Sequence, residues 1–236
     1  MTRLLAFDTS TDVMSIALCL PEATLVFEGE GGALASARLI PEVLALLARG
    51  GCGLRQLDAI GFGRGPGAFT GLRSACSVAQ GLALGAGLPV LALDSLLLVA
   101  QDAFDADAGT TDIWVAMDAR MDEIYAAHYR RVGAHWQVLE APMLCRAEAL
   151  NERWARHPPQ AVAGSALTVF GARLQVGAAR LRPSTRARAG ALAQLARAAW
   201  ADGAAVDAAL ALPVYLRVKV AQTTAEREAA RAALAS

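Results

Sequence analysis

The sequence predicts an α/β protein made of two lobes that share one order of strands and helices. Short apolar runs separated by polar turns open the chain, as expected of antiparallel strands. Later segments place apolar residues at the spacing of a helix, and the opening strand–turn–strand pattern recurs in the second half. Of the 236 residues, 55% are hydrophobic and 19% are charged. Such a composition supports a buried core and excludes a disordered chain.

The first predicted lobe begins with three strands and a helix. Apolar runs separated by polar turns favour antiparallel strands at residues 4–7, 13–20 and 24–28. The period then changes to that of a helix over residues 35–49. One apolar face supports this helix, formed by Leu39, Val43, Leu46 and Leu47.

Strands and helices alternate in the rest of this lobe. We predict strands at residues 57–62 and 90–93 and helices at residues 72–86 and 95–104. The resulting order, β-β-β-α-β-α-β-α, is that of a ribonuclease-H-like lobe.

The second half repeats the opening segment. AFDTSTDVMSIAL (residues 6–18) aligns without gaps on AMDARMDEIYAAH (residues 116–128), which places Asp8 on Asp118 and Asp12 on Asp122. A further strand, a helix and a short strand follow, at residues 136–140, 146–156 and 161–163. We therefore predict two duplicated lobes that face each other across a cleft. They cover residues 1–107 and 108–220, with a tail at 221–236.

The polar turn after the first strand is a candidate phosphate or nucleotide site. Asp8, Thr9 and Ser10 place a carboxylate, two hydroxyls and backbone N–H groups at a strand end beside the predicted cleft. Such a turn can hold a phosphate group or a magnesium-bound water. The same residues also form an Asx-turn that closes a hairpin without any ligand, and the turn alone favours this second interpretation.

A glycine-rich loop, GRGPGAFTGLR at residues 63–73, is the second candidate phosphate site. Gly65 and Gly67 allow close approach of the backbone to a ligand or to another chain. Thr70 is a predicted N-cap for the next helix, whose N-terminus favours an anion. The loop has no G-K-[ST] and is therefore not a Walker sequence. Lys219, the only lysine, is far from it.

We predict no catalytic residue and no metal site. The three histidines lack the spacing of zinc ligands, and the chain has no G-x-S-x-G nucleophile elbow. Asp118 and Asp122 could form a second phosphate or metal site, but a salt bridge with Arg120 or Arg130 is the commoner use of such residues.

The helix after the glycine loop has one face that is nearly free of side chains. Ser74, Ser77, Gly81 and Gly85 follow each other at three- and four-residue spacing. Each glycine costs about 1 kcal/mol relative to alanine in a helix interior, so we expect close packing to offset that cost. The neighbour is either the chain's own sheet or a partner subunit.

The charge balance and the cysteines bear on the cellular setting. The chain has 22 basic and 22 acidic residues, so net charge gives no general reason to bind nucleic acid. An arginine run favours a solvated surface over an RNA contact, at Arg180, Arg182, Arg186 and Arg188. The four cysteines form no C-x-x-C pair and suit a reducing cytosol. The first apolar run stops at Asp8, so we predict no signal peptide. Gly87, Pro89 and Asp94 interrupt the apolar stretch at residues 82–100, so we predict no membrane span and a cytoplasmic location.

Four motifs together resemble the bacterial TsaB (YeaZ) family. They are LLAFDTSTDVMSIAL, the long stretch GRGPGAFTGLRSACSVAQGLALGAGLPVLALDSL, DARMDEIYAAHY and PVYLRVKVA, and they are spread over residues 4–221. The resemblance implies an actin-like ATPase fold that is shared with the catalytic subunit TsaD. Family members often carry a histidine just before the first long helix, where this chain has Ala35. This departure further weakens a metal-enzyme interpretation.

The resemblance also implies a function and partners. It implies a non-catalytic subunit that binds and activates TsaD during formation of N6-threonylcarbamoyladenosine at position 37 of tRNA. The ATPase TsaE joins this pair, a homodimer forms when TsaD is absent, and tRNA is met only through the complex. No cofactor is required, although ATP or ADP is possible. The alternative function is an independent ATPase or metallopeptidase-like hydrolase that uses the Asp8–Thr9–Ser10 cleft.

The resemblance assigns the partner surface to the two long helices of the first lobe. We expect a four-helix interface in which each chain contributes two helices. The expected interface residues are Leu39, Val43, Leu46, Leu47, Arg73, Ser74, Ser77, Val78, Gly81 and Gly85.

Overall fold

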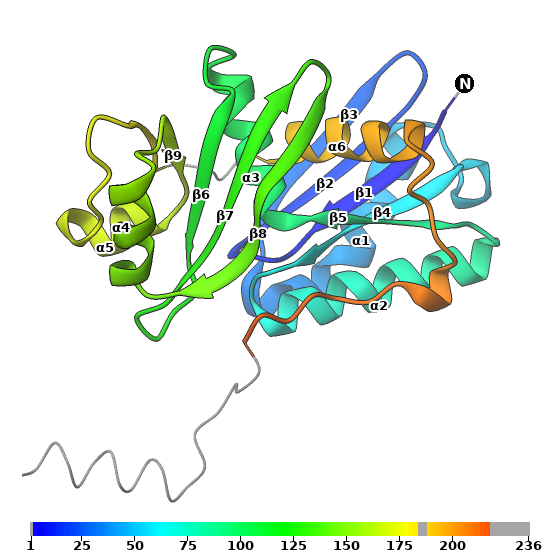
Figure 1. Ribbon diagram of the computed structural model, residues 1–236. Helices are drawn as coiled ribbons and strands as arrows, with labels where there is room; N and C mark the ends of the chain where they lie inside the picture. The colour runs from blue at the N-terminus through cyan, green and yellow to red at the C-terminus, as the bar shows by residue number, and fades with distance from the viewer. Residues whose placement is uncertain (1, 184–187, 218–236) are drawn as a thin grey trace, which may run out of the picture.

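Two five-stranded sheets form the centre of the computed structural model, which describes residues 2–183 and 188–217 (Figure 1). The predicted tail, Lys219 and Arg186 lie outside these described residues. None of the described helices is long and apolar enough to cross a membrane.

The first sheet has the strand order β3-β2-β1-β4-β5. Its strands β1, β2 and β3 pair antiparallel, whereas β4 and β5 run parallel to β1. This arrangement is that of a ribonuclease-H-like sheet. The strands are β1 (Leu4–Asp8), β2 (Val13–Cys19), β3 (Thr24–Glu30), β4 (Ala59–Gly65) and β5 (Val90–Asp94).

The second sheet repeats the pattern with the order β10-β9-β6-β7-β8. Again three consecutive strands pair antiparallel and two parallel strands follow on the other side of the first. The duplicated actin-like fold is therefore confirmed. The strands are β6 (Asp112–Asp118), β7 (Ile124–Val132), β8 (His135–Cys145), β9 (Ala161–Ala163) and β10 (Arg180–Arg182).

Helices cover the outer faces and fill the space between the sheets (Figure 1). On one face of the first sheet lie α1 (Ala35–Arg49) and α2 (Phe69–Ala86). Between the two sheets lies α3 (Ser95–Ala106), which packs on β6. The far face of the second sheet is covered by α4 (Ala147–Arg156) and α5 (Ala166–Phe170).

Helix α6 (Ala189–Ala201) crosses back to the first sheet and departs from the predicted division into lobes. The prediction placed it in the second lobe, but it packs against β1 and β2. Alternate residues of a strand face opposite sides of the sheet. While Leu5 and Phe7 of β1 face α1 and α2, Leu4 and Ala6 therefore need a second cover, and α6 provides it.

The helix after the glycine loop begins earlier than the sequence predicts. Phe69 is its first residue and Ala68 its N-cap, without a side-chain hydrogen bond to the helix. The prediction that Thr70 caps the helix is therefore wrong, because Thr70 lies within the first turn. Its hydroxyl is consequently not required to hold the helix end.

Buried polar contacts tie the two lobes together. The Tyr129 hydroxyl of β7 donates a hydrogen bond of 2.7 Å to Asp94, at the end of β5. Burial raises the pKa of both groups. Nearby, Trp136 Nε1 donates to Gln101 Oε1 at 2.8 Å. Since donors and acceptors come from different lobes, these contacts fix one lobe against the other.

Candidate functional site

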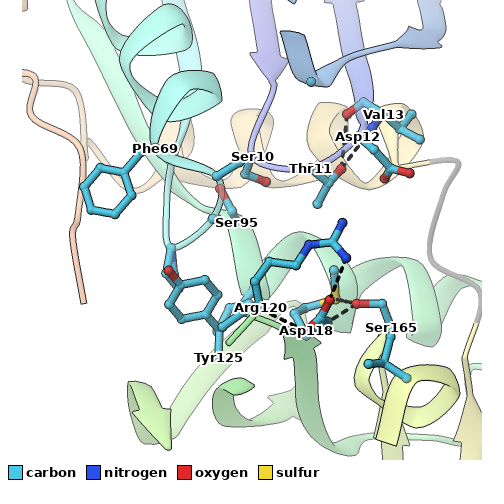
Figure 2. Close-up of a pocket in the computed structure, with 18 of the residues that line it drawn as sticks. Ser10, Thr11, Asp12, Val13, Phe69, Ser95, Asp118, Arg120, Tyr125 and Ser165 are labelled. Atoms are coloured by element: carbon cyan, nitrogen blue, oxygen red, sulfur yellow. Dashed lines mark hydrogen bonds and ion pairs between the residues drawn. The ribbon is translucent and has the colours of Figure 1, made fainter. Parts of the chain in front are cut away.

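A cavity of about 770 Å³ lies between the lobes, where the ends of β1 and β6 face each other (Figure 2). The first lobe lines it with Ser10, Thr11 and the start of α2. The second lobe lines it with Asp118, Arg120 and other residues near the β6–β7 turn. A cavity of this size accommodates a small-molecule ligand.

The structure brings only part of the predicted phosphate site to this cavity. Ser10 and Gly67 line it. The other predicted residues are absent from its lining: Asp8, Thr9, Gly65 and Thr70. Asp8 and Thr9 have no exposed surface, because they lie beneath the cavity wall at the end of β1.

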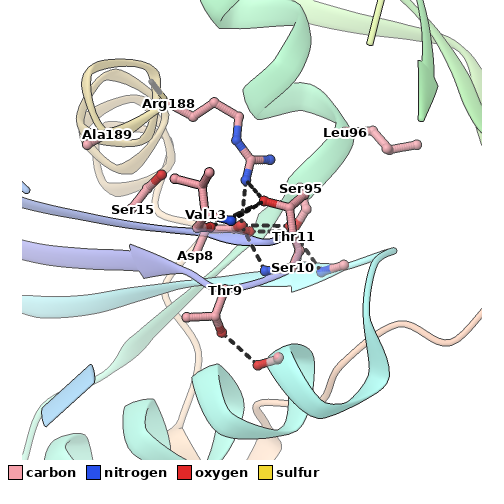
Figure 3. Close-up of polar contacts among 12 residues, drawn as sticks. Asp8, Thr9, Ser10, Thr11, Val13, Ser15, Ser95, Leu96, Arg188 and Ala189 are labelled. Carbon is pink, nitrogen blue, oxygen red and sulfur yellow. Dashed lines mark hydrogen bonds and ion pairs between the residues drawn. The ribbon is translucent and has the colours of Figure 1, made fainter. Parts of the chain in front are cut away.

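The Asp8 carboxylate accepts hydrogen bonds from other groups of the protein (Figure 3). Its Oδ1 accepts hydrogen bonds from Ser10 N at 3.0 Å and from the Ser10 hydroxyl at 2.6 Å. Its Oδ2 accepts one from the Ser95 hydroxyl at 2.7 Å. The first contacts are those of the Asx-turn that the sequence analysis favoured for these residues.

Arg188 completes the surroundings of Asp8 from the start of α6. Its Nη2 lies 3.4 Å from Asp8 Oδ1 and 2.6 Å from the Thr11 hydroxyl. The side chains of Arg188 and Asp8 are 1% and 0% exposed, so this ion pair is desolvated. Arg188 therefore supplies the positive charge beside this buried carboxylate.

Acidic groups surround Arg188 on other sides. Glu28 accepts hydrogen bonds from Ala189 N at 2.5 Å and from the Ser15 hydroxyl at 2.7 Å. Burial raises the pKa of Glu28. Burial also raises the pKa of Asp102 to about 6, although the nearby Arg188 opposes this shift. The start of α6 is therefore held to the first sheet by the buried Arg188–Asp8 pair and by the hydrogen bond from Ala189 N to Glu28.

The glycines of the loop at residues 63–73 serve internal packing around the Asp8 turn. A Cβ atom on Gly63 would lie 1.7 Å from Asp8 Oδ2, and one on Gly71 would lie 1.8 Å from the Thr9 carbonyl oxygen. At Gly67 it would lie 2.5 Å from the Ser10 carbonyl oxygen. These distances rule out any side chain without backbone movement, so the glycines are explained without a ligand.

The corresponding turn of the second lobe is conformationally unusual. Arg120, Met121 and Asp122 all have positive φ angles, of 63°, 56° and 60°, a region that non-glycine residues seldom adopt. The Arg120 side chain points into the cavity and pairs with Asp118 at 3.2 Å (Figure 2). Arg217 stabilises the turn, since its Nη2 donates hydrogen bonds to the carbonyl oxygens of Ala119 and Arg120 at 2.9 and 3.1 Å.

The predicted partner surface divides into a buried and an exposed part. Leu39, Val43, Leu46 and Leu47 lie in the core of the first lobe. Their assignment to the interface is therefore wrong: this apolar face of α1 packs on the chain's own sheet. Of the predicted residues on α2, Ser74 and Val78 are half-buried, and the following are exposed: Arg73, Ser77, Gly81 and Gly85.

The outer face of these two helices is nonetheless apolar. Ile40 and Leu44 of α1 are exposed, as is Leu84 of α2. Gly81 and Gly85 have open space where a Cβ atom would stand. The stripe at Gly81 and Gly85 therefore faces outward rather than toward the chain's own sheet.

Sequence reasoning missed two functional features. It gave Arg188 only as one of a surface run, because nothing local distinguishes it from Arg180 and Arg182, which pair with Asp107 at 3.4 and 3.1 Å. It also assigned no contacts to residues 211–217. The PVYLR sequence there carries no periodic pattern, and its contacts are made with distant parts of the chain, as between Tyr215 and Phe69.

Comparisons with known proteins find TsaB relatives and a family model of the related protein TsaD. A family model of the tRNA N6-adenosine threonylcarbamoyltransferase TsaD matches residues 34–181. The chain is 37% identical over 158 residues to the tRNA threonylcarbamoyladenosine biosynthesis protein TsaB of Haemophilus influenzae, covering 63% of this chain and 66% of the relative. It is 37% identical over 152 residues to TsaB of Escherichia coli K12, covering 64% and 65%. The matched region thus spans just under two thirds of these relatives.

Solved structures match over more of the chain. The structure titled YeaZ from Pseudomonas aeruginosa has 37% sequence identity and a TM-score of 0.82, covering 92% of this chain and all of that one. A second, described as an uncharacterized protein with similarity to peptidase YeaZ, from Pseudomonas aeruginosa, has 38% identity and a TM-score of 0.84 over the same shares.

Proposed function

The chain belongs to the TsaB (YeaZ) family, and on that premise we propose that it is the non-catalytic subunit that binds and activates TsaD in tRNA N6-threonylcarbamoyladenosine formation. The exposed apolar face of α1 and α2 carries this proposal. A face with Ile40, Leu44 and Leu84 in solvent, beside glycines that leave room for a close neighbour, suits a helical partner. TsaE joins the pair, and tRNA is met through the complex in the cytoplasm.

The Asp8 turn supports the non-catalytic part of the proposal. Its carboxylate accepts hydrogen bonds from Ser10 and Ser95, and the buried guanidinium of Arg188 neutralises it. Releasing it for a metal ion would strand a buried guanidinium, at a cost of about 3–5 kcal/mol. No cofactor is therefore required by the proposed role.

The docking part is tested by Gly81→Leu on α2, with Gly190→Leu on α6 as the matched control. Both glycines are exposed helical residues with open space around the Cβ position, so neither change disturbs the fold. We expect Gly81→Leu to weaken TsaD binding by about tenfold or more, because the leucine removes the room for a close neighbour. Gly190→Leu should bind like the wild type. Equal binding by the two variants would reject this surface.

Activation is tested by reconstitution with TsaD and TsaE, with modified nucleoside measured by mass spectrometry of digested tRNA. We expect modification to require this chain and to fall with Gly81→Leu. Modification that proceeds equally well without the chain would refute the proposed function. In the absence of TsaD, we expect sedimentation velocity to detect a homodimer that Gly81→Leu weakens.

The alternative is an independent ATPase or metallopeptidase-like hydrolase at the Asp8–Thr9–Ser10 cleft, and the interlobe cavity is the observation that favours it. Arg120→Gln tests it, because Arg120 points into the cavity while its side chain is 85% exposed, so the change leaves the core intact. An enzyme that works in this cavity would lose ATP or peptide hydrolysis. A scaffold would still activate TsaD.

A further inference from the structure

The segment from Ala211 to Arg217, which we call the strap, runs along α2 and ends on the second lobe (Figure 1). At its start, the Ala211 carbonyl oxygen accepts a hydrogen bond from Gln80 Nε2 at 2.9 Å. Further along, the Tyr215 ring stacks on Phe69, with centroids 4.8 Å apart. The strap therefore lies antiparallel to α2, from the middle of that helix back to its first residue.

The strap is fixed although it has no regular secondary structure. Val214 N donates to the Arg64 carbonyl oxygen at 2.7 Å, and Arg73 Nε donates to the Tyr215 hydroxyl at 3.3 Å. At its end, Arg217 pairs with Glu123 at 2.7 Å. A segment held in this way loses little conformational freedom when a partner covers it, which favours binding.

Around the start of the strap, small apolar side chains are buried and large apolar side chains are exposed to solvent. Ala208 and Ala211 are buried against the core of the first lobe. Leu210 and Leu212, the larger apolar residues, are 69% and 68% exposed. Leu84 on α2, one turn beyond the contact at Gln80, is 64% exposed. Small residues inside and leucines outside extend the apolar face of α2 onto the strap.

A partner that covers α2 with an interface of ordinary area also covers the strap, because the strap lies directly beside α2. A stable interface covers about 800 Å² on each partner, which corresponds to a disc of about 16 Å radius. Packed helices lie about 8–10 Å apart, and the strap is in hydrogen-bond contact with α2. A disc centred on α2 therefore covers its neighbours, α1 and the strap.

We propose that the strap is a third element of the docking surface for TsaD, beside α1 and α2, and that Leu212 of the strap and Leu210 just before it contact the TsaD subunit directly. This inference rests on the proposed function. The occupant is TsaD because the surface is continuous with the α2 face proposed to bind it. The match of the TsaD family model to residues 34–181 also suggests that TsaD carries a comparable lobe with a helical face to present.

The test compares three exposed leucines changed to arginine, with TsaD binding measured by isothermal titration calorimetry. Leu212→Arg tests the strap, and Leu84→Arg tests the α2 face. Leu181→Arg, on β10 of the other lobe, is the control, since Leu181 is 46% exposed. Because all three side chains are in solvent, the melting temperatures should match that of the wild type. We expect Leu212→Arg and Leu84→Arg each to weaken binding about tenfold or more, and Leu181→Arg to have no effect.

The outcomes separate the two proposals. If Leu84→Arg weakens TsaD binding and Leu212→Arg leaves it unchanged, the strap inference is overturned and the proposed function stands. If neither change weakens binding, both are overturned. If sedimentation velocity shows that Leu212→Arg disrupts only self-association of this chain, the occupant is a second copy and the assignment to TsaD is wrong.

Discussion

Two glycines of α2 should respond in opposite directions to the same change, alanine. Gly81 faces open space, so Gly81→Ala adds a Cβ atom without a clash. It should raise the free energy of unfolding by about 1 kcal/mol, the helix propensity difference between the two residues. For a chain of this length that corresponds to about 2–4 °C in melting temperature.

Gly71→Ala should destabilise the protein instead. The new Cβ atom would lie 1.8 Å from the Thr9 carbonyl oxygen and 2.9 Å from the Thr9 carbonyl carbon. Both are backbone atoms, so β1 or α2 must move, and overpacking of this kind costs about 1–3 kcal/mol. Movement also strains the 2.7 Å hydrogen bond from the Thr9 hydroxyl to the Gly71 carbonyl oxygen, worth about 1 kcal/mol. After subtracting the helix gain, we expect a net loss of about 1–3 kcal/mol.

Urea denaturation followed by circular dichroism measures both changes, at protein concentrations where sedimentation velocity finds a monomer. The wild type is the common reference, and the two variants should differ by about 2–4 kcal/mol, the sum of the gain and the loss. If Gly71→Ala were as stable as the wild type, close packing would not explain the glycine. The ligand interpretation of the loop would then regain support.

Three further predictions concern buried polar groups. Arg188→Met and Asp8→Asn should each cost about 3–5 kcal/mol by stranding a desolvated partner, and the double variant should cost less than the sum in a double-mutant cycle. Tyr129→Phe should cost about 1–2 kcal/mol, because Asp94 loses its interlobe donor; an unchanged melting temperature would contradict this. Folding raises the pKa of Asp102 to about 6, so its ionised form is disfavoured in the folded state. Asp102 should therefore make stability fall as pH rises from about 4 to 6. Asp102→Asn should make that fall smaller in denaturation measured across this range, and the remainder belongs to groups such as Glu28 and Asp94, whose pKa values are also raised.

Local periodicity was enough to predict most of the fold. The helix predicted at residues 35–49 matches α1 to the residue, since its apolar positions and its terminal glycines are close together in sequence. The alignment of Asp8 on Asp118 anticipated two equivalent sheets, and both residues end the first strand of their sheet. Patterns of this kind depend only on neighbours along the chain, and the sequence therefore contains them in full.

The sequence did not reveal which surface each pattern faces. The apolar stripe with Leu39 and Val43 has the same residue spacing whether a sheet or a partner subunit covers it. In the structure the chain's own sheet covers it. The bare stripe at Gly81 was equally ambiguous, and it faces outward. Periodicity identifies a face of a helix but not its neighbour, because the neighbour comes from another part of the chain.

By itself, the sequence determined the order of the elements, their duplication and the turn at Asp8. Only the tertiary structure decided what that turn does. Arg188 lies 180 residues from Asp8 along the chain, and α6 carries it there because the second face of β1 needs an apolar cover. Burial removes water from both charges, so that breaking the pair would leave an uncompensated charge in the interior. Charge pairing and desolvation arise from distances in space, which no local pattern of residues encodes.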